Sequence, residues 1–176
     1  HDLEQFLLAI NKNTKVIYIA NPNNPTGTLI DKSILKSFLD NVPKNIIVVL
    51  DEAYDEYLDE DIKSEAFGWI SEYKNLLVSR SFSKAYGLAG MRLGYGVSSS
   101  HLIEVMNRIR QPFNVNNLAQ IAAIASLDDD DFIFKSKRIN NLGMKQITTA
   151  FSGLGIDFIE SYGNFIAFKF EDEQAA

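Results

Sequence analysis

Three short segments of this sequence hold most of the side chains that could do chemistry. They are residues 21–27 (NPNNPTG), residues 51–54 (DEAY) and residues 81–92 (SFSKAYGLAGMR). Taken one at a time, such segments are usually a turn, a helix cap or a solvated loop. Taken together, they offer an amine, a carboxylate, a phenol, amides, hydroxyls and a guanidinium. Their combined chemistry matters only if the fold brings the three segments to one place.

Each of these segments follows a run that is typical of a buried strand. The runs are residues 16–20, 76–78 and 46–50, and the last (IIVVL) is apolar on both faces, as a central parallel strand would be. In open α/β sheets, ligands bind outside the carboxyl ends of the strands. The pattern therefore predicts that the three segments lie side by side at one edge of a sheet.

Further elements must position this edge. Apolar spacing predicts helices at residues 2–10 with Asp2 as a cap, at 34–39, within a crossover segment at 55–73, at 101–110, at 116–127 and after 128–131. More strands are expected at residues 93–97 and, as a short pair, within 156–170. Strand and helix alternate for about the first hundred residues, which indicates an α/β sheet leading into a second, smaller unit.

Composition excludes several classes of protein. The chain has 176 residues, 46% of them hydrophobic, no cysteine and a net charge of −6. That charge has the wrong sign for holding nucleic acid through its phosphates. Without cysteine, and with only His1 and His101, the sequence has no disulfide, no cysteine nucleophile and no histidine-rich metal site. No apolar run reaches the roughly 20 residues of a membrane-spanning helix.

Two acidic runs favour plain interpretations. Asp55, Glu56 and Tyr57 begin the run 55–61, which is typical of a solvated loop rather than a site. The run 128–131 favours a helix start over a metal site, because four consecutive acids cannot all face one ion.

The combined side chains match what pyridoxal phosphate needs. This cofactor requires an amine for a Schiff base, an acid against its pyridine nitrogen, hydrogen bonds to its ring hydroxyl, and cations or hydroxyls around its phosphate. The three segments offer each of these groups. A dianion can then be held by a few converging groups, in spite of the negative net charge.

The same segments resemble a known family. NPNNPTG, DEAY and SFSKAYGLAGMRLGY, at residues 21–27, 51–54 and 81–95, are similar to the fold-type I aminotransferases. Within that group, RQPFNVNNLAQIAA at residues 110–123 resembles the histidinol-phosphate aminotransferase branch. Threonine-phosphate decarboxylases share similar stretches, so this last segment is the weaker signal.

The resemblance implies a role for each matching residue. Lys84 would form the Schiff base, take the Cα proton of the substrate and return it at the C4′ carbon of the cofactor. Asp51 would pair with the pyridine nitrogen and keep it protonated.

The other cofactor-binding residues are implied in the same way. Tyr54 and Asn24 would hydrogen-bond the phenolic oxygen of the ring. Ser81, Ser83 and Arg92 would hold the phosphate, and the arginine offers a bidentate fork. No metal is expected.

The resemblance also implies a fold and partners. We expect a three-layer α/β/α large domain of the pyridoxal-phosphate-dependent transferase type, with a mostly parallel mixed sheet, over residues 1–110. Residues 111–176 would form connecting helices and the start of a smaller α+β domain, and both domains would be incomplete. A cytoplasmic homodimer is implied, acting on an amino donor and a 2-oxo acid, with histidinol phosphate and 2-oxoglutarate as the expected pair.

Several alternatives stay open at this point. Another fold-type I enzyme is possible, either an aromatic or aspartate-type aminotransferase or a threonine-phosphate decarboxylase-like lyase. The chain opens on a histidine within a helix pattern, which favours a fragment that is inactive by itself or serves only a structural role. Asn116 and Gln120, one helical turn apart, could support the floor of the site, and nothing assigns a role to Asn164.

Overall fold

The computed structural model describes residues 1–170. Its elements along the chain are α1 (Leu3–Ala9), β1 (Val16–Ala20), α2 (Lys32–Asn41), β2 (Ile47–Asp51), the 3-10 helix η1 (Asp55–Tyr57), α3 (Ala66–Trp69), β3 (Leu76–Ser81), the 3-10 helix η2 (Ala89–Met91), β4 (Gly94–Ser98), α4 (Ser100–Ile109), α5 (Asn117–Leu127) and α6 (Asp130–Leu154).

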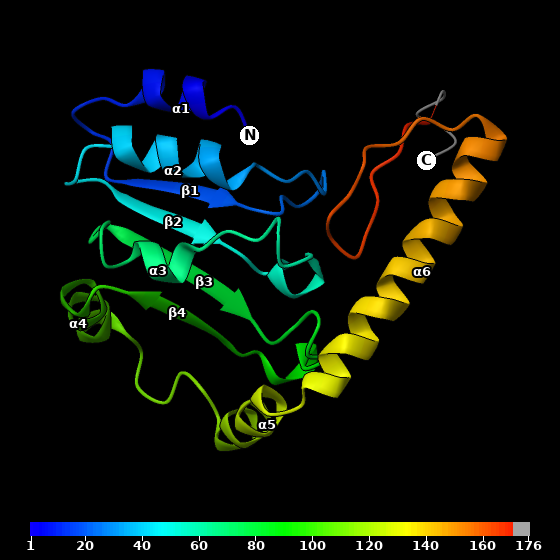
Figure 1. Cartoon of the computed structure of the whole chain (residues 1–176). Helices are drawn as coiled ribbons and strands as arrows, with labels where there is room; N and C mark the ends of the chain where they lie inside the picture. Colours follow the sequence, from blue (N-terminus) through cyan, green and yellow to red (C-terminus); the bar gives the residue numbers. More distant parts are fainter. Residues whose placement is uncertain (171–176) are drawn as a thin grey trace.

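The four strands form one mixed sheet in the order β1-β2-β3-β4. The first three strands are parallel and β4 is antiparallel to β3. In Figure 1 the arrows of β1, β2 and β3 accordingly point to the same side, towards α6, and β4 runs back. The register aligns Ala20 with Asp51, Asp51 with Ser79, and Ser81 with Gly94. The predicted mostly parallel mixed sheet is confirmed, and its carboxyl ends meet at one edge.

The two faces of this sheet differ in burial. One face packs against α1, α2 and α3 and forms the core, to which the strands contribute Ile17, Ile19, Val48, Leu50, Leu76 and Val78. The opposite face is more open, since Val16 and Tyr18 are more than half exposed. The prediction that residues 46–50 are buried on both faces is therefore not met, because Val49 and Ile47 are only half-buried within residues 1–170.

Helix starts follow the local sequence closely. Asp2 caps α1 by accepting from the Gln5 N–H at 3.1 Å, as predicted. Asp129 caps α6 by accepting from the Phe132 N–H at 3.0 Å, which confirms the helix-start role of the run 128–131. Among residues 1–170, no group of three or more histidines or acids is placed to hold a metal ion.

Asn116 and Gln120, which were considered as support for the floor of the site, make local hydrogen bonds at the start of α5. The Asn116 side chain accepts from the Ala119 N–H at 2.8 Å and caps the helix. The Gln120 amide is exposed and donates to the Val115 carbonyl at 3.3 Å. Both bonds are local to the start of α5, and a role of either residue at the floor of the site stays a prediction.

Two predicted elements are shorter than expected. The crossover helix within residues 55–73 is reduced to the four residues of α3. The strand pair within residues 156–170 is reduced to one antiparallel bridge, between Phe158 and Phe168. A two-stranded ribbon is marginal unless a third strand or a helix supports it. Here the ring of Phe151, from α6, packs against both bridge residues and supplies that support.

Within the described range, no helix combines the length and the apolar character needed to cross a membrane. The domain boundary between residues 110 and 111 stays a prediction. The end of the second unit, residues 171–176, lies outside the described residues.

Candidate active site

The three chemistry-bearing segments meet at the carboxyl edge of the sheet. Asp51 is the last residue of β2 and Ser81 is the last residue of β3. The N–H of Asn21, directly after β1, donates to the Asp51 carbonyl at 2.9 Å. The predicted convergence is therefore a consequence of parallel pairing: three strands of similar length end at the same level.

The loop after β1 is held rigid by the first of its asparagines. Asn21 is buried, and its side chain both accepts from the Ile30 N–H at 2.7 Å and donates to the Ile30 carbonyl at 3.2 Å. These two hydrogen bonds join the beginning of the loop to its end, and Asn24 lies exposed between them. The Asn24 amide donates to the Tyr54 hydroxyl at 2.8 Å. The structure thus brings together the two residues predicted to bind the ring oxygen.

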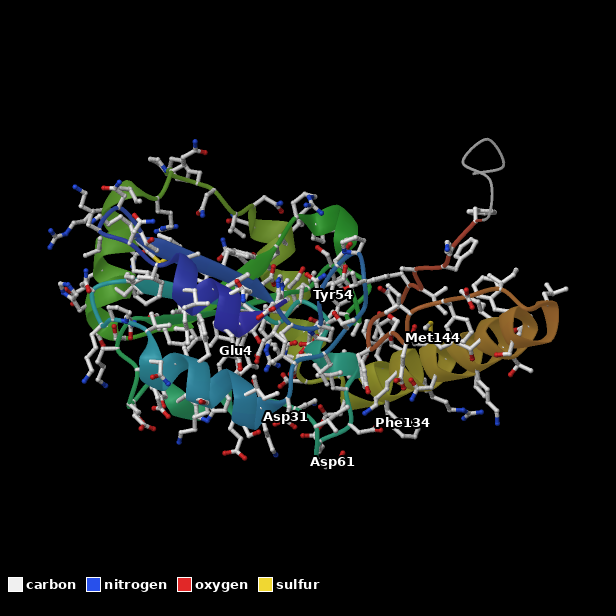
Figure 2. All side chains as sticks on the ribbon, turned by 90° about the horizontal axis from the view of Figure 1, so that it is seen from above. Glu4, Asp31, Tyr54, Asp61, Phe134 and Met144 are labelled. Atoms are coloured by element: carbon white, nitrogen blue, oxygen red, sulfur yellow. The ribbon has the colours of Figure 1, made fainter. Side chains whose placement is uncertain are left out.

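Lys84 lies over the face of Tyr54. The distance from its Nζ to the centre of the Tyr54 ring is 5.2 Å, a cation–π contact. Among residues 1–170, Nζ has no hydrogen-bond or ion-pair partner. The Tyr54 ring is buried, and Figure 2 labels this residue. Ile133, near the start of α6, and Phe165 pack against the buried cluster that contains Tyr54. The amine is therefore placed beside a buried ring, without a polar partner among the described residues.

Asp51 is held by a residue that the sequence reasoning missed. The Tyr18 hydroxyl donates to Asp51 Oδ2 at 2.6 Å, and the Ala53 N–H donates to Oδ1 at 3.2 Å. A signal for Tyr18 was available, because it alternates with the core residues Ile17 and Ile19 and so faces the same side of the sheet as Asp51.

The three predicted phosphate ligands lie near the start of β4, and two of them, Ser81 and Ser83, are joined by a hydrogen bond. The N–H of Ser83 donates to the Ser81 hydroxyl at 3.0 Å. Pairing of Ser81 with Gly94 puts the start of β4 beside these serines. Arg92 sits just before β4 in the left-handed conformation, with φ 55°, and its exposed guanidinium donates to the Ala89 carbonyl at 2.8 Å. Arg92 therefore lies at the carboxyl edge of the sheet, and one hydrogen bond of its guanidinium is seen within the described residues.

A buried ion cluster lies beneath these groups. The Arg80 guanidinium contacts Glu52 Oε2 and Asp55 Oδ2, each at 2.7 Å, and stacks on the Phe67 ring with 4.6 Å between Cζ and the ring centre. Ser64 donates to the other oxygen of Glu52. Burial raises the pKa of both carboxyls, and the charge of Arg80 opposes that rise.

The cluster corrects the prediction of a solvated loop at residues 55–61. Asp55, Glu56 and Tyr57 are all buried, whereas residues 59–61 are exposed as expected. The physical reason is η1, whose tight turn directs the first acids inward to Arg80. Glu56 lies 3.7 Å from Arg80 Nη1, and both of its oxygens are buried without a hydrogen-bond partner among residues 1–170.

The buried carboxyl group of Glu56 should make the stability of the protein depend on pH. Burial raises its pKa from 4.5 to about 7. The folded protein thus binds this proton more tightly than the unfolded chain, so the stabilisation is complete below about pH 4.5 and is lost as the pH rises through 7. We expect Glu56→Gln to be near neutral at pH 5 and to raise the unfolding free energy at pH 8 by about 1–3 kcal/mol.

Urea unfolding at the two pH values measures this difference. The control is Glu60→Gln, since Glu60 is exposed and its pKa is lowered by its hydrogen bond to Lys63. If Glu56→Gln and wild type keep the same pH slope between 5 and 8, Glu56 does not carry the buried proton.

The segment around Gly163 closes the site from the far end of the chain. The Tyr162 N–H donates to the Gly27 carbonyl at 2.8 Å, and the Phe165 ring meets the Tyr54 ring edge-on with 5.2 Å between centres. Sequence reasoning gave no role to Asn164 in this segment, and that residue is exposed. The contribution of the segment comes instead from Phe165 and from the backbone of Tyr162.

Gly27 should tolerate no side chain. Its φ is +76°, and a Cβ would overlap the Ser161 side chain and come within 2.8 Å of the Ser161 Cα. We expect Gly27→Ala to lower the unfolding free energy by about 2–4 kcal/mol, because left-handed strain and overlap add. Gly155→Ala is the matched control: its φ is +71° but the space around it is open, so only about 1 kcal/mol should be lost. Equal losses for both variants, measured by urea unfolding, would contradict the proposed contact with Ser161.

Comparisons with known proteins show what this chain is similar to. The sequence profile of the family "Aminotransferase class I and II" matches residues 1–176. A histidinol-phosphate aminotransferase from Methylobacillus flagellatus is 56% identical over 168 residues, which cover 96% of this chain and 45% of that protein. Histidinol-phosphate aminotransferase 2 of Pseudomonas aeruginosa is 52% identical over 167 residues, covering 95% of this chain and 45% of that protein.

Solved structures of aminotransferases are also similar to this chain. The histidinol-phosphate aminotransferase of Sinorhizobium meliloti in complex with pyridoxal-5'-phosphate superposes with a TM-score of 0.90 at 31% identity, over 99% of this chain and 47% of that one. Thermus thermophilus aspartate aminotransferase with maleate has a TM-score of 0.82 at 22% identity, over 94% and 44% of the two chains, and shares the fold. The predicted α/β fold class is thereby confirmed. The chain spans about half the length of the curated relatives it matches.

Proposed function

Because this chain belongs to the class I and II aminotransferase family, we propose that it carries the reactive lysine of a pyridoxal-phosphate-dependent transaminase. We further propose that the full-length protein transfers the amino group of histidinol phosphate to 2-oxoglutarate. The observation that carries the proposal is the Lys84 amine, unpaired among the described residues, above a Tyr54 ring whose hydroxyl is bonded to Asn24. The names of the most similar relatives support the substrate.

The side chains present fit the chemistry of this cofactor. An aldehyde needs a free amine, which Lys84 offers. A pyridine nitrogen needs a fixed acid, and Asp51 is fixed by two hydrogen bonds on the open face of the sheet. A phenolate oxygen needs donors, and the Asn24 amide and the Tyr54 hydroxyl lie together. Ser81, Ser83 and Arg92 would hold the phosphate.

In the proposed reaction, each residue of this chain has a definite task. Bound pyridoxal phosphate supplies a ring that accepts the electron pair left at the substrate Cα. Lys84 removes the Cα proton and delivers it to the C4′ carbon of the cofactor, acting as base and then as acid. Asp51 holds the proton on the pyridine nitrogen. Phe165 packs against Tyr54 and so keeps the Tyr54 ring in place beside Lys84.

Two parts of the proposal rest on the resemblance. They are the assembly of the protein as a homodimer and its location in the cytoplasm. Sedimentation of the purified full-length protein tests the first, because a monomer at micromolar concentration would contradict it.

A substrate comparison tests the reaction. The full-length protein is incubated with 2-oxoglutarate and, in turn, histidinol phosphate, aspartate, phenylalanine and threonine phosphate, and glutamate is measured. We expect kcat/KM for histidinol phosphate to exceed the others by about a hundredfold or more. Release of carbon dioxide from threonine phosphate without glutamate formation would instead identify a lyase.

A labelling experiment tests the cofactor separately. Pyridoxal phosphate is added to the full-length protein and to this chain alone, the adduct is reduced with borohydride, and the modified peptide is identified by mass spectrometry. We expect the label on Lys84. A full-length protein that lacks this label would overturn the cofactor assignment.

A further inference from the structure

Tyr18 contacts the proposed cofactor acid from a neighbouring strand. Its hydroxyl lies 2.6 Å from Asp51 Oδ2, while the Ala53 N–H reaches Oδ1 at 3.2 Å. The carboxylate is therefore bonded at both oxygens, by groups that belong to two different segments. Such a carboxylate has one orientation, because rotation about its side chain would break both bonds.

The direction of the Tyr18 hydrogen bond follows from protonation. Burial of the hydroxyl, its hydrogen bond to Asp51 and the charge of Asp51 together raise the pKa of Tyr18 to about 12. At neutral pH the phenol is thus protonated and donates to the carboxylate. A hydrogen bond from a neutral donor to an ionised acceptor is of the strong class.

This arrangement leaves room for a third donor. A carboxylate has about four acceptor sites, and Tyr18 and Ala53 use two of them. Both Tyr18 and Asp51 are on the open face of the sheet, where the Tyr18 ring is 56% exposed and Asp51 is half-buried. Each oxygen of Asp51 can therefore accept one more bond from a ligand on that face.

Resting on the proposed function, we infer that Tyr18 is a positioning residue: its hydroxyl holds the Asp51 carboxylate so that a free acceptor site meets the protonated pyridine nitrogen of the cofactor. Without this hydroxyl, the Asp51 carboxylate loses one of its two restraints. The positive charge on the pyridine nitrogen is then held less firmly.

Removal of the hydroxyl by Tyr18→Phe in the full-length protein tests the inference. We expect the Kd for pyridoxal phosphate, measured by absorbance titration, to rise about tenfold, as for the loss of one hydrogen bond to a charged group. The pH midpoint of the absorbance change of the bound cofactor should rise by about half a unit or more, because less positive charge on the ring leaves the lysine-linked nitrogen more basic.

The chain contains a matched control for this variant. The Tyr73 hydroxyl also donates to an aspartate, Asp40, but it does so near the amino end of β3, away from the site. Tyr73→Phe should leave both the Kd and the pH midpoint unchanged, whatever it does to stability.

A double-mutant cycle separates positioning from a general structural effect. In an Asp51→Asn background, Tyr18→Phe should change the Kd by less than about twofold, because the charged acceptor is gone. An unchanged Kd for Tyr18→Phe in the wild-type background, or an equal loss in both backgrounds, overturns the inference while Lys84 labelling stays intact. Absence of the Lys84 label in wild type would instead overturn the proposed function and this inference with it.

Discussion

Replacement of Lys84 by alanine in the full-length protein should abolish transamination. Lys84 is assigned both the covalent link to the cofactor and the movement of the Cα proton, so two contributions are lost together. We expect kcat to fall by at least about 10⁴-fold, measured as glutamate formed from 2-oxoglutarate. Lys84→Arg should be equally inactive, because it keeps the charge but cannot form the link.

The same variants should leave the fold intact. Within residues 1–170, Nζ of Lys84 has no hydrogen-bond or ion-pair partner, so the unfolding midpoint in urea should change little. Lys74→Ala, which removes an exposed lysine, is the control and should keep full activity. Activity within tenfold of wild type in Lys84→Ala, with the borohydride label on a different lysine, would show that the assignment is wrong.

Replacement of Arg80 by methionine should be the most destabilising single change beneath the site. It would leave Glu52 and Asp55, each 2% exposed, without their main cation, and within the described residues Lys63, at 3.9 Å from Asp55, is the one cation that remains in contact with them. Breaking a buried ion pair from one side costs about 3–5 kcal/mol, because the remaining charge stays buried. We expect a loss of that size in the free energy of unfolding, measured in urea at pH 7.

Neutralising the stranded charge should recover part of the loss. In the double variant Arg80→Met with Glu52→Gln, one of the three carboxyl groups that face the missing guanidinium can no longer carry a charge, so about 1–2 kcal/mol should return. Lys36→Met is the surface control, since its pair with Glu72 is exposed and should contribute less than about 1 kcal/mol. A loss below 1 kcal/mol for Arg80→Met would mean that the cluster does not hold the ends of β2 and β3 together.

The fold was predictable to the extent that its signals are local. Short apolar runs marked all four strands, with β-branched residues concentrated in β1 and β2, and Asp2 and the run 128–131 were recognisable as helix starts. The strand ends were less predictable, because β3 extends through the polar Arg80 and Ser81 to pair with β4. The pair of strands within residues 156–170 was overestimated, since its aromatic residues pack against α6 rather than into a sheet.

The residues of the site also divide into those with a local sequence signal and those without one. Asn24, Asp51, Tyr54 and Lys84 were predicted to lie close together because each stands at or after the end of a predicted strand, and the carboxyl ends of parallel strands meet. The inward turn of Asp55 and Glu56 was not found, because their partner Arg80 lies more than twenty residues away. The contact of Tyr18 with Asp51 was also missed, since it depends on the register between β1 and β2.

By itself, the sequence determined the chemistry that this protein carries and the edge of the sheet at which it is displayed, because residue types and strand periodicity are local properties. Tertiary structure alone decided which oxygen each donor reaches, which acids are buried, and that Phe165 closes on Tyr54. Those outcomes depend on register and packing between segments that are tens of residues apart; a local pattern can indicate the face of a side chain, as for Tyr18, but not its partner.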